Sequence, residues 1–259
     1  MKRRTIKSIQ KYLEPKEIFN LIISNYHVYS YNQDYFVSRD RALMAMTYCA
    51  AGRISEIVPG DKFATVVNPV SGVKETVKVG RHPGVRRENI IVKDDYIIVS
   101  GLKVVKRNWK LLLIYGEAVA TRDDFIIPLK CGLFVNPYWD QLVPFGHLIL
   151  NYLVLHAPSE GALFPITRFR AYQIIRETTG MFPHWFRAQA EHFYGNFLLT
   201  DSIKLAKFVK VVNPSSVREY IGYDWRQQLK DKHLGLDFDW IDDAVQSLIL
   251  ERKRKEGVE

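Results

Sequence analysis

Two short apolar runs, separated by only two residues, constrain the fold of this chain more than any other feature. Residues 89–93 and 96–100 are rich in isoleucine and valine, and Asp94-Asp95 joins them. A two-residue connection between such runs is typical of a β-hairpin, whose strands pair antiparallel. The sequence therefore predicts a small antiparallel sheet. Further strands are predicted at 110–115, 125–128, 63–67 and 75–79.

Most of the remaining chain has the spacing of amphipathic helices. Apolar residues recur at helical spacing over 13–23 and again over 40–49, which Gly52 follows as a helix-ending residue. Residues 24–38 are rich in tyrosine and asparagine and are expected to form a loop. The predicted fold class is therefore mainly α with a small antiparallel β-sheet, or α+β. Additional helices are predicted at 138–156, 168–179, 186–199, 202–209, 216–229 and 238–250.

Composition indicates one large domain with a basic surface. The chain has 259 residues, of which 47% are hydrophobic, enough to bury a sizeable core. We expect a basic leader at 1–11, one domain at 12–250 that ends in the helix at 238–250, and a charged tail at 251–259. Lysine and arginine total 37 against 28 aspartate and glutamate, a net charge of +9. This balance suits nucleic-acid binding, although many basic proteins bind none.

Other features exclude some classes of protein. The two cysteines, Cys49 and Cys131, do not form a CxxC pair, so no structural zinc site is expected. Both lie in apolar surroundings and are expected to be small core residues in a reducing, intracellular compartment. No stretch of the chain approaches the roughly 20 apolar residues of a membrane span.

Four short motifs carry residues suited to phosphate chemistry, and the first is Arg53-Ile54-Ser55-Glu56, just after the predicted helix at 40–49. The planar guanidinium of an arginine makes two charge-assisted hydrogen bonds to phosphate oxygens. The simpler interpretation of this motif alone is a surface ion pair between Arg53 and Glu56.

The second motif is the turn that follows the predicted hairpin. It contains Gly101 and Lys103, with Lys106 and Arg107 close behind. A lysine on such a turn acts as a general acid if its pKa falls. Lys103 is the first candidate for this role and Lys106 the second, while the simpler interpretation is a turn that contacts phosphate.

The third motif, His184-Trp185-Phe186-Arg187, opens a predicted helix. Residues three apart on a helix share a face, so an imidazole and a guanidinium would converge on one phosphate. A helix start without any chemistry remains the simpler interpretation of this motif by itself.

The fourth motif contains Tyr220, with the small hydroxyl residue Ser216 four positions before it. Tyr220 lies 33 positions after Arg187 (220 − 187), and Tyr223 lies 36 positions after it (223 − 187). In a chain with 14 tyrosines, the simpler interpretation is that both pack on a helix.

Together and in this order, the four motifs resemble those of tyrosine site-specific recombinases of the phage-integrase kind, over about residues 13–250. The resemblance makes 12–250 the catalytic domain, with the DNA breaking-rejoining fold. It implies an integrase that cuts and rejoins DNA through a 3′-phosphotyrosyl link and needs no metal, nucleotide or other cofactor. The implied residues are the nucleophile Tyr220 (Tyr223 fits the spacing less well), the phosphate-binding Arg53 and Arg187, the acid Lys103 or Lys106, the proton-exchanging His184, and Glu56, which orients Arg53.

The same resemblance implies partners and a setting. Double-stranded DNA is the expected partner, with four copies of the chain assembled on two DNA sites and a monomer off DNA left open. The expected location is the cytoplasm, at the nucleoid, and a host cell if the chain is viral. The Phe-Arg-Ala-Gln run at 186–189 is similar to archaeal members. In the family the C-terminal helix often packs on a neighbouring subunit; here it is expected to do so or to fold back on its own chain.

The chain departs from the family pattern at three places. Val211 stands nine positions before Tyr220, where the family has a histidine or tryptophan, and the nearest polar residue is Lys210. Only about eleven residues precede the domain, so the N-terminal clamp of the family is expected to be missing from a fragment, absent from a minimal enzyme, or supplied by a partner. The segment 61–88 is longer than the family version and is either a DNA-facing element or a solvated basic loop. The candidate DNA-binding arginines are Arg81, Arg86 and Arg87 in this segment, together with Arg107.

Three other functions stay open. A catalytically degenerate DNA-binding protein on the same fold would form no covalent link to DNA. A type IB topoisomerase would relax any supercoiled plasmid regardless of sequence. An RNA-binding protein would not bind duplex DNA tightly with a steep salt dependence.

Overall fold

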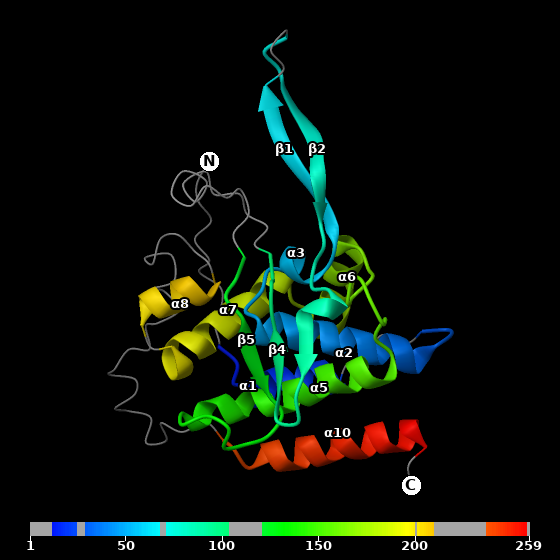
Figure 1. The fold of residues 1–259 in the computed structure, drawn as a ribbon, viewed down its shortest axis with the longest axis vertical. Coiled ribbons are helices and arrows are strands. Elements are labelled where there is room, and N and C mark those ends of the chain that lie inside the picture. Colours follow the sequence, from blue (N-terminus) through cyan, green and yellow to red (C-terminus); the bar gives the residue numbers. More distant parts are fainter. Residues whose placement is uncertain are drawn as a thin grey trace.

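Helix α2 (Gln33–Cys49) lies at the centre of the computed structural model (Figure 1). Its second half is buried on every side, and α5 (Val143–Leu155) and α7 (Pro183–Phe193) pack against it. Tyr48 stacks on Phe145 with ring centroids 4.8 Å apart. Such a helix is apolar all round because neighbouring helices cover each of its faces. The structure describes residues 12–24, 29–67, 71–103, 121–199, 201–209 and 237–257.

Helices make up most of the described chain, and the strands form small antiparallel sheets, as predicted for the α+β class. The predicted helices at 168–179 and 202–209 are confirmed with the same bounds. The other helices are α1 (Pro15–Ser24), α3 (Ile54–Ile57), α6 (Arg168–Thr179), α8 (Ser202–Val209) and α10 (Trp240–Glu256), with the turns η1 (Arg87–Asn89), η2 (Pro137–Leu142) and the π-helical η3 (Tyr194–Leu198).

The predicted hairpin around Asp94-Asp95 is confirmed and forms part of a three-stranded sheet. The amide of Lys93 donates a hydrogen bond to the carbonyl oxygen of Tyr96 at 2.9 Å and closes the turn. The sheet packs against α5 at Gly146, where a Cβ atom would lie only 2.3 Å from the carbonyl oxygen of Pro128, so this position requires glycine. The strands, in the order β3-β4-β5, are β3 (Ile90–Val92), β4 (Tyr96–Val99) and β5 (Phe125–Pro128).

A second hairpin, β1 (Gly60–Val67) and β2 (Lys74–His82), projects away from the rest of the molecule (Figure 1). Both strands were predicted, and each is longer than expected. The base of this hairpin is anchored by the buried ring of His82: the amide of Gly84 donates to Nδ1 at 3.0 Å, and Nε2 lies 2.9 Å from the carbonyl oxygen of Lys103. We call β1 and β2 together the ribbon.

The C-terminal helix α10 folds back on its own chain and lies along α5 (Figure 1). Asn151 donates a side-chain hydrogen bond to the carbonyl oxygen of Leu248 at 3.0 Å, and the indole of Trp240 donates to Gln141 at 3.2 Å. Helix α10 was expected either to pack on a neighbouring subunit or to fold back on its own chain. Its described contacts are with its own chain. Among the described residues, no helix has the length and apolar character needed to cross a bilayer.

Four predictions of local structure are wrong. Residues 33–38 are helical rather than a loop, and the expected charged tail is helical as far as Glu256. The predicted helix at 186–199 begins earlier, at Pro183, and changes to a π-helical turn at Tyr194. Cys131 is exposed rather than in the core. The predicted strand at 110–115 and helix at 216–229 lie outside the described residues.

Buried His192 is expected to make the fold less stable in acid. Its ring stacks on Tyr12 with centroids 3.5 Å apart, and burial lowers its pKa to about 4 from an ordinary 6.5. Between pH 6.5 and 4 the unfolded chain binds a proton that the folded chain does not, so stability is lost as the pH falls. We expect a loss of about 3 kcal/mol across this window in urea unfolding, and His192→Gln to remove most of that dependence. The control is His184→Gln, because His184 is exposed and its replacement should leave the pH dependence of stability unchanged. An unchanged pH dependence in His192→Gln would contradict the prediction.

Candidate functional site, a buried arginine cluster

Arg53 and Glu56 form a closed unit at the start of α3. Arg53 precedes the first helical residue in an extended conformation, and its amide donates to the Glu56 carboxylate at 3.0 Å. Its guanidinium Nη1 also donates to Glu56, at 2.8 Å. A carboxylate at the third helical position commonly caps the helix in this way. The interpretation as a surface pair is wrong, because the Glu56 side chain is completely buried.

Arg187 reaches the same carboxylate from α7. Its Nη1 lies 3.9 Å from Oε2 of Glu56, and its Nε forms an ion pair with Glu191 at 2.7 Å. Glu191 is four residues further along the same helix, a spacing at which helical side chains meet. The first and third sequence motifs therefore come together around Glu56.

A third arginine, Arg122, completes the cluster and was missed by the sequence analysis. It precedes β5, and its Nη1 lies 3.7 Å from Oε2 of Glu56. Its Nε and Nη2 both donate to the carbonyl oxygen of Phe208 in α8, at 3.1 and 2.9 Å. We call Arg53, Glu56, Arg122, Arg187 and Glu191 the arginine cluster.

The arginine cluster carries more positive than negative charge in a buried place. Three guanidiniums face two carboxylates, a formal excess of one positive charge (3 − 2). Burial lowers the pKa of Arg122 to about 10, against the opposing effect of Glu56, and it also lowers the pKa of Arg187. A pKa of about 10 leaves Arg122 protonated at neutral pH. Buried cations in excess of their counter-ions are stabilised by binding an anion.

Hydrogen-bond donors in the arginine cluster remain open to such an anion. Within the described residues, Nη1 of Arg122 and Nη1 of Arg187 have no hydrogen-bond partner. Buried donors normally have one. Only Arg53 reaches solvent, because 27% of its side chain is exposed, against 1% for Arg122 and 3% for Arg187. A ligand would therefore approach through Arg53.

Lys103 lies at the same end of the three-stranded sheet as Arg122. Lys103 pairs with Thr121 in an isolated antiparallel bridge, and the amide of Arg122 donates to the carbonyl oxygen of Leu102 at 2.8 Å. The Lys103 side chain is exposed and donates to the Thr121 hydroxyl at 2.9 Å. The lysine is thus held next to the strand that presents Arg122.

His184 and Arg187 occupy the same helix in different surroundings. His184 is exposed in the first turn of α7, whereas Arg187 is buried. The two side chains were predicted to converge on one site. Of the two, Arg187 is buried at Glu56, whereas His184 lies exposed at the surface. Five candidate residues lie outside the described part of the chain: Lys106, Arg107, Lys210, Tyr220 and Tyr223.

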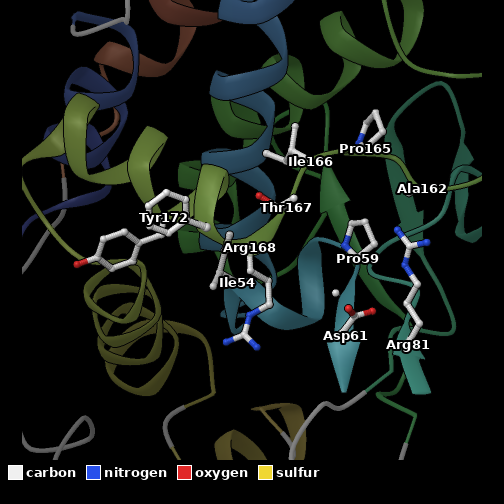
Figure 2. Close-up of a pocket in the computed structure, with 12 residues that line it drawn as sticks. Ile54, Pro59, Asp61, Arg81, Ala162, Pro165, Ile166, Thr167, Arg168 and Tyr172 are labelled. Carbon is white, nitrogen blue, oxygen red and sulfur yellow. The ribbon is translucent and has the colours of Figure 1, made fainter. Parts of the chain in front are cut away.

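An open cleft of about 900 Å³ lies between the base of the ribbon and α6 (Figure 2). Arg81 on β2 and Arg168 on α6 stand on opposite walls, and neither forms an ion pair or hydrogen bond with another described residue. Phe169 also lines the cleft and is 70% exposed. Ile54, which follows Arg53 in the sequence, also lines the cleft.

Two other predicted DNA-binding arginines, Arg86 and Arg87, have partners. Arg86 is exposed and forms an ion pair with Glu88 at 3.0 Å. Arg87 donates to the carbonyl oxygen of Ile90 at 3.2 Å. A smaller hollow beside the cleft is lined by both Arg81 and Arg86. Cations therefore continue from the cleft along the base of the ribbon.

Comparison of this chain with protein-family models, with curated proteins and with solved structures finds no match. Among the described residues, no three histidine, cysteine, aspartate or glutamate side chains gather in a group that could hold a metal ion. A functional proposal therefore depends on the residues of the arginine cluster and of the adjoining cleft.

Proposed function

We propose that this chain is a site-specific DNA strand transferase of the tyrosine recombinase type, with its fold, and that it acts as an integrase. The observation that supports this proposal is the meeting of Arg53 and Arg187 at Glu56. The two arginines are 134 positions apart (187 − 53), and both motifs assign them to one phosphate. A buried excess of positive charge with open donors suits a single phosphodiester.

In the proposed reaction, Arg53 and Arg187 neutralise the non-bridging oxygens of the scissile phosphate. Charge stabilisation of this kind dominates phosphoryl transfer. Tyr220 attacks the phosphorus in line and passes its proton to His184. The bond to the 5′ oxygen breaks, and Lys103 protonates the leaving oxygen. The products are a 3′-phosphotyrosyl link and a free 5′ hydroxyl, and attack by another 5′ hydroxyl reverses the step and joins the strands.

Double-stranded DNA fits the surface around the cleft. Exposed cations on facing walls suit the phosphates of a duplex, and a two-stranded ribbon has the width that the major groove admits. Arg81 and Arg168 would contact backbone phosphates next to the one bound by Arg53. Recombination between two such sites requires four copies of the chain.

The test is covalent trapping on DNA. The full chain is incubated with nicked duplexes from the genetic element that encodes it, denatured in detergent, and examined for a DNA-linked protein band. We expect a band with the wild type and with Tyr223→Phe, and none with Tyr220→Phe, because a phenyl ring lacks the attacking oxygen.

Each other outcome selects a different function or site. A band lost only in Tyr223→Phe keeps the reaction and moves the nucleophile. Tight duplex binding without a band on any duplex favours the catalytically degenerate DNA-binding protein. Val211, which stands where the family has a histidine or tryptophan, would then account for part of the lost activity. Relaxation of an arbitrary supercoiled plasmid favours a type IB topoisomerase.

A further inference from the structure

Arg122 joins the arginine cluster to helix α8 through one planar group. One edge of the guanidinium donates twice to the carbonyl oxygen of Phe208, at 3.1 and 2.9 Å, and the remaining nitrogen faces Glu56 at 3.7 Å. The side chain is 1% exposed, so Arg122 is enclosed by protein. The described contacts of its side chain are therefore with protein groups, the Phe208 carbonyl and the Glu56 carboxylate.

The contacts at the α8 end are specific to an arginine. Phe208 lies in the last turn of α8, where backbone carbonyls lack partners within the helix and a positive charge is favourable. The guanidinium carbon also lies 4.9 Å from the centre of the Phe208 ring and 5.9 Å from that of Phe125. A forked, planar cation satisfies the carbonyl and packs on both rings, which a lysine would not do.

Packing alone does not account for a charge in this position. Glu56 already has a 2.8 Å ion pair with Arg53, so Arg122 increases the excess of positive charge. Replacing buried charges by apolar residues of similar volume is often neutral or stabilising. A buried cation without full neutralisation therefore lowers the stability of the fold. We infer that Arg122 is kept because it links α8 to Glu56 of α3.

We propose that Arg122 is a positioning residue, which fixes the end of α8 to Glu56 and so holds at the arginine cluster the helix that precedes Tyr220 in the sequence. Helix α8 ends at Val209, which precedes Tyr220 by 11 positions (220 − 209). The role in the reaction depends on the proposed function, whereas the link between Glu56 and α8 does not.

The first experiment measures the link by hydrogen–deuterium exchange of the full chain. In Arg122→Met we expect the amides of α8 to exchange at least about ten-fold faster, because the helix loses its anchor. The matched control is Arg39→Met, which removes a buried arginine that pairs with Asp40 in α2 and has no contact with the cluster. Arg122→Lys keeps the charge but loses the two guanidinium hydrogen bonds to the Phe208 carbonyl. If the methionine variant does not fold, α8 exchange is compared between this lysine variant and the control. Unchanged α8 exchange in both Arg122 variants would overturn the proposal.

The second experiment measures the reaction. At equal folded fraction, we expect Arg122→Met to form the covalent adduct about ten-fold more slowly or worse, with duplex affinity within about two-fold of the wild type. A residue that acts through the arginine cluster gives non-additive losses, so the double variant with Arg53→Ala should be little slower than Arg53→Ala alone. An unchanged adduct rate, or losses that multiply, would overturn the positioning role. If the wild type forms no adduct on any duplex, the proposed function fails and the exchange experiment still decides the link.

Discussion

Replacement of Glu56 by glutamine is expected to lower the free energy of unfolding by about 3–5 kcal/mol. Glutamine has nearly the same shape but no charge, so the guanidiniums of Arg53, Arg122 and Arg187 would face one another around a neutral group. Breaking a buried pair by removing one partner leaves uncompensated charge in a place that water does not reach. Because the free energy of unfolding of a domain is commonly only about 5–15 kcal/mol, this single change would remove a large part of the stability of the fold.

Urea unfolding at neutral pH measures this loss. The matched control is Glu88→Gln, which removes an exposed carboxylate from its 3.0 Å ion pair with Arg86. An exposed pair contributes about 0–1 kcal/mol, so the control should stay close to the wild type. Equal losses in the two variants would mean that Glu56 is not the counter-charge on which the arginine cluster depends.

The second large effect concerns the reaction rather than the fold. Arg53→Ala is expected to slow adduct formation about 10²–10³-fold, because it removes the solvent-accessible cation that would meet the developing charge on phosphate. Glu56 keeps its contacts with Arg122 and Arg187 in this variant, so the fold should persist. Duplex affinity should change little, since one phosphate contact alters the salt dependence by a slope of only about 0.9.

Single-turnover trapping on the duplex that gives a wild-type adduct checks the rate, and a salt series of binding measurements checks the affinity. Arg254→Ala is the matched control, because it removes an exposed arginine from α10, away from the cluster and the cleft. A variant at position 53 that cleaves as fast as this control would remove Arg53 from the proposed mechanism. Loss of cleavage together with unfolding would instead assign Arg53 to the fold.

Local patterns in the sequence predicted the parts of the fold that local interactions determine. The two-residue turn at Asp94-Asp95 and the hairpin around it required only backbone geometry and apolar runs. The unit formed by Arg53 and Glu56 was visible in the same way, since a capping carboxylate lies three positions from its partner. Glu191 was visible in principle, at four positions from Arg187 on a predicted helix.

Tertiary contacts decided what the sequence patterns missed. Residues 33–38 are polar and aromatic, yet they are helical because Tyr35 packs near Tyr152 and His156, and the Arg39 guanidinium lies over the Phe36 ring. The charged C-terminal stretch stays helical with help from the 3.2 Å ion pair of Lys255 with Asp34 of α2. These neighbours are not adjacent in the sequence or depend on a folded partner, so periodicity did not indicate them.

Arg122 was beyond prediction for the same reason. Its partner Phe208 is 86 positions away (208 − 122), and Glu56 is 66 positions away (122 − 56). The residues that flank it carry no motif that distinguishes it from the other arginines. Only the tertiary fold, which brings Arg122 to Glu56 of α3 and to Phe208 of α8, places the three groups together.

The ribbon leaves and re-enters the body of the protein at neighbouring points. Gly60 pairs with His82, and beyond them Gly84 turns with a φ of 70° directly against Val58, where no side chain would fit. The ribbon makes a sheet of its own, separate from the three strands that hold Arg122 and Lys103 in place. We therefore expect that a ribbon of different sequence can replace positions 60 to 82 without disturbing the arginine cluster, because the two lie on separate sheets. Under the proposed function, such an exchange would change which DNA the protein prefers and leave the residues proposed to cut it in place.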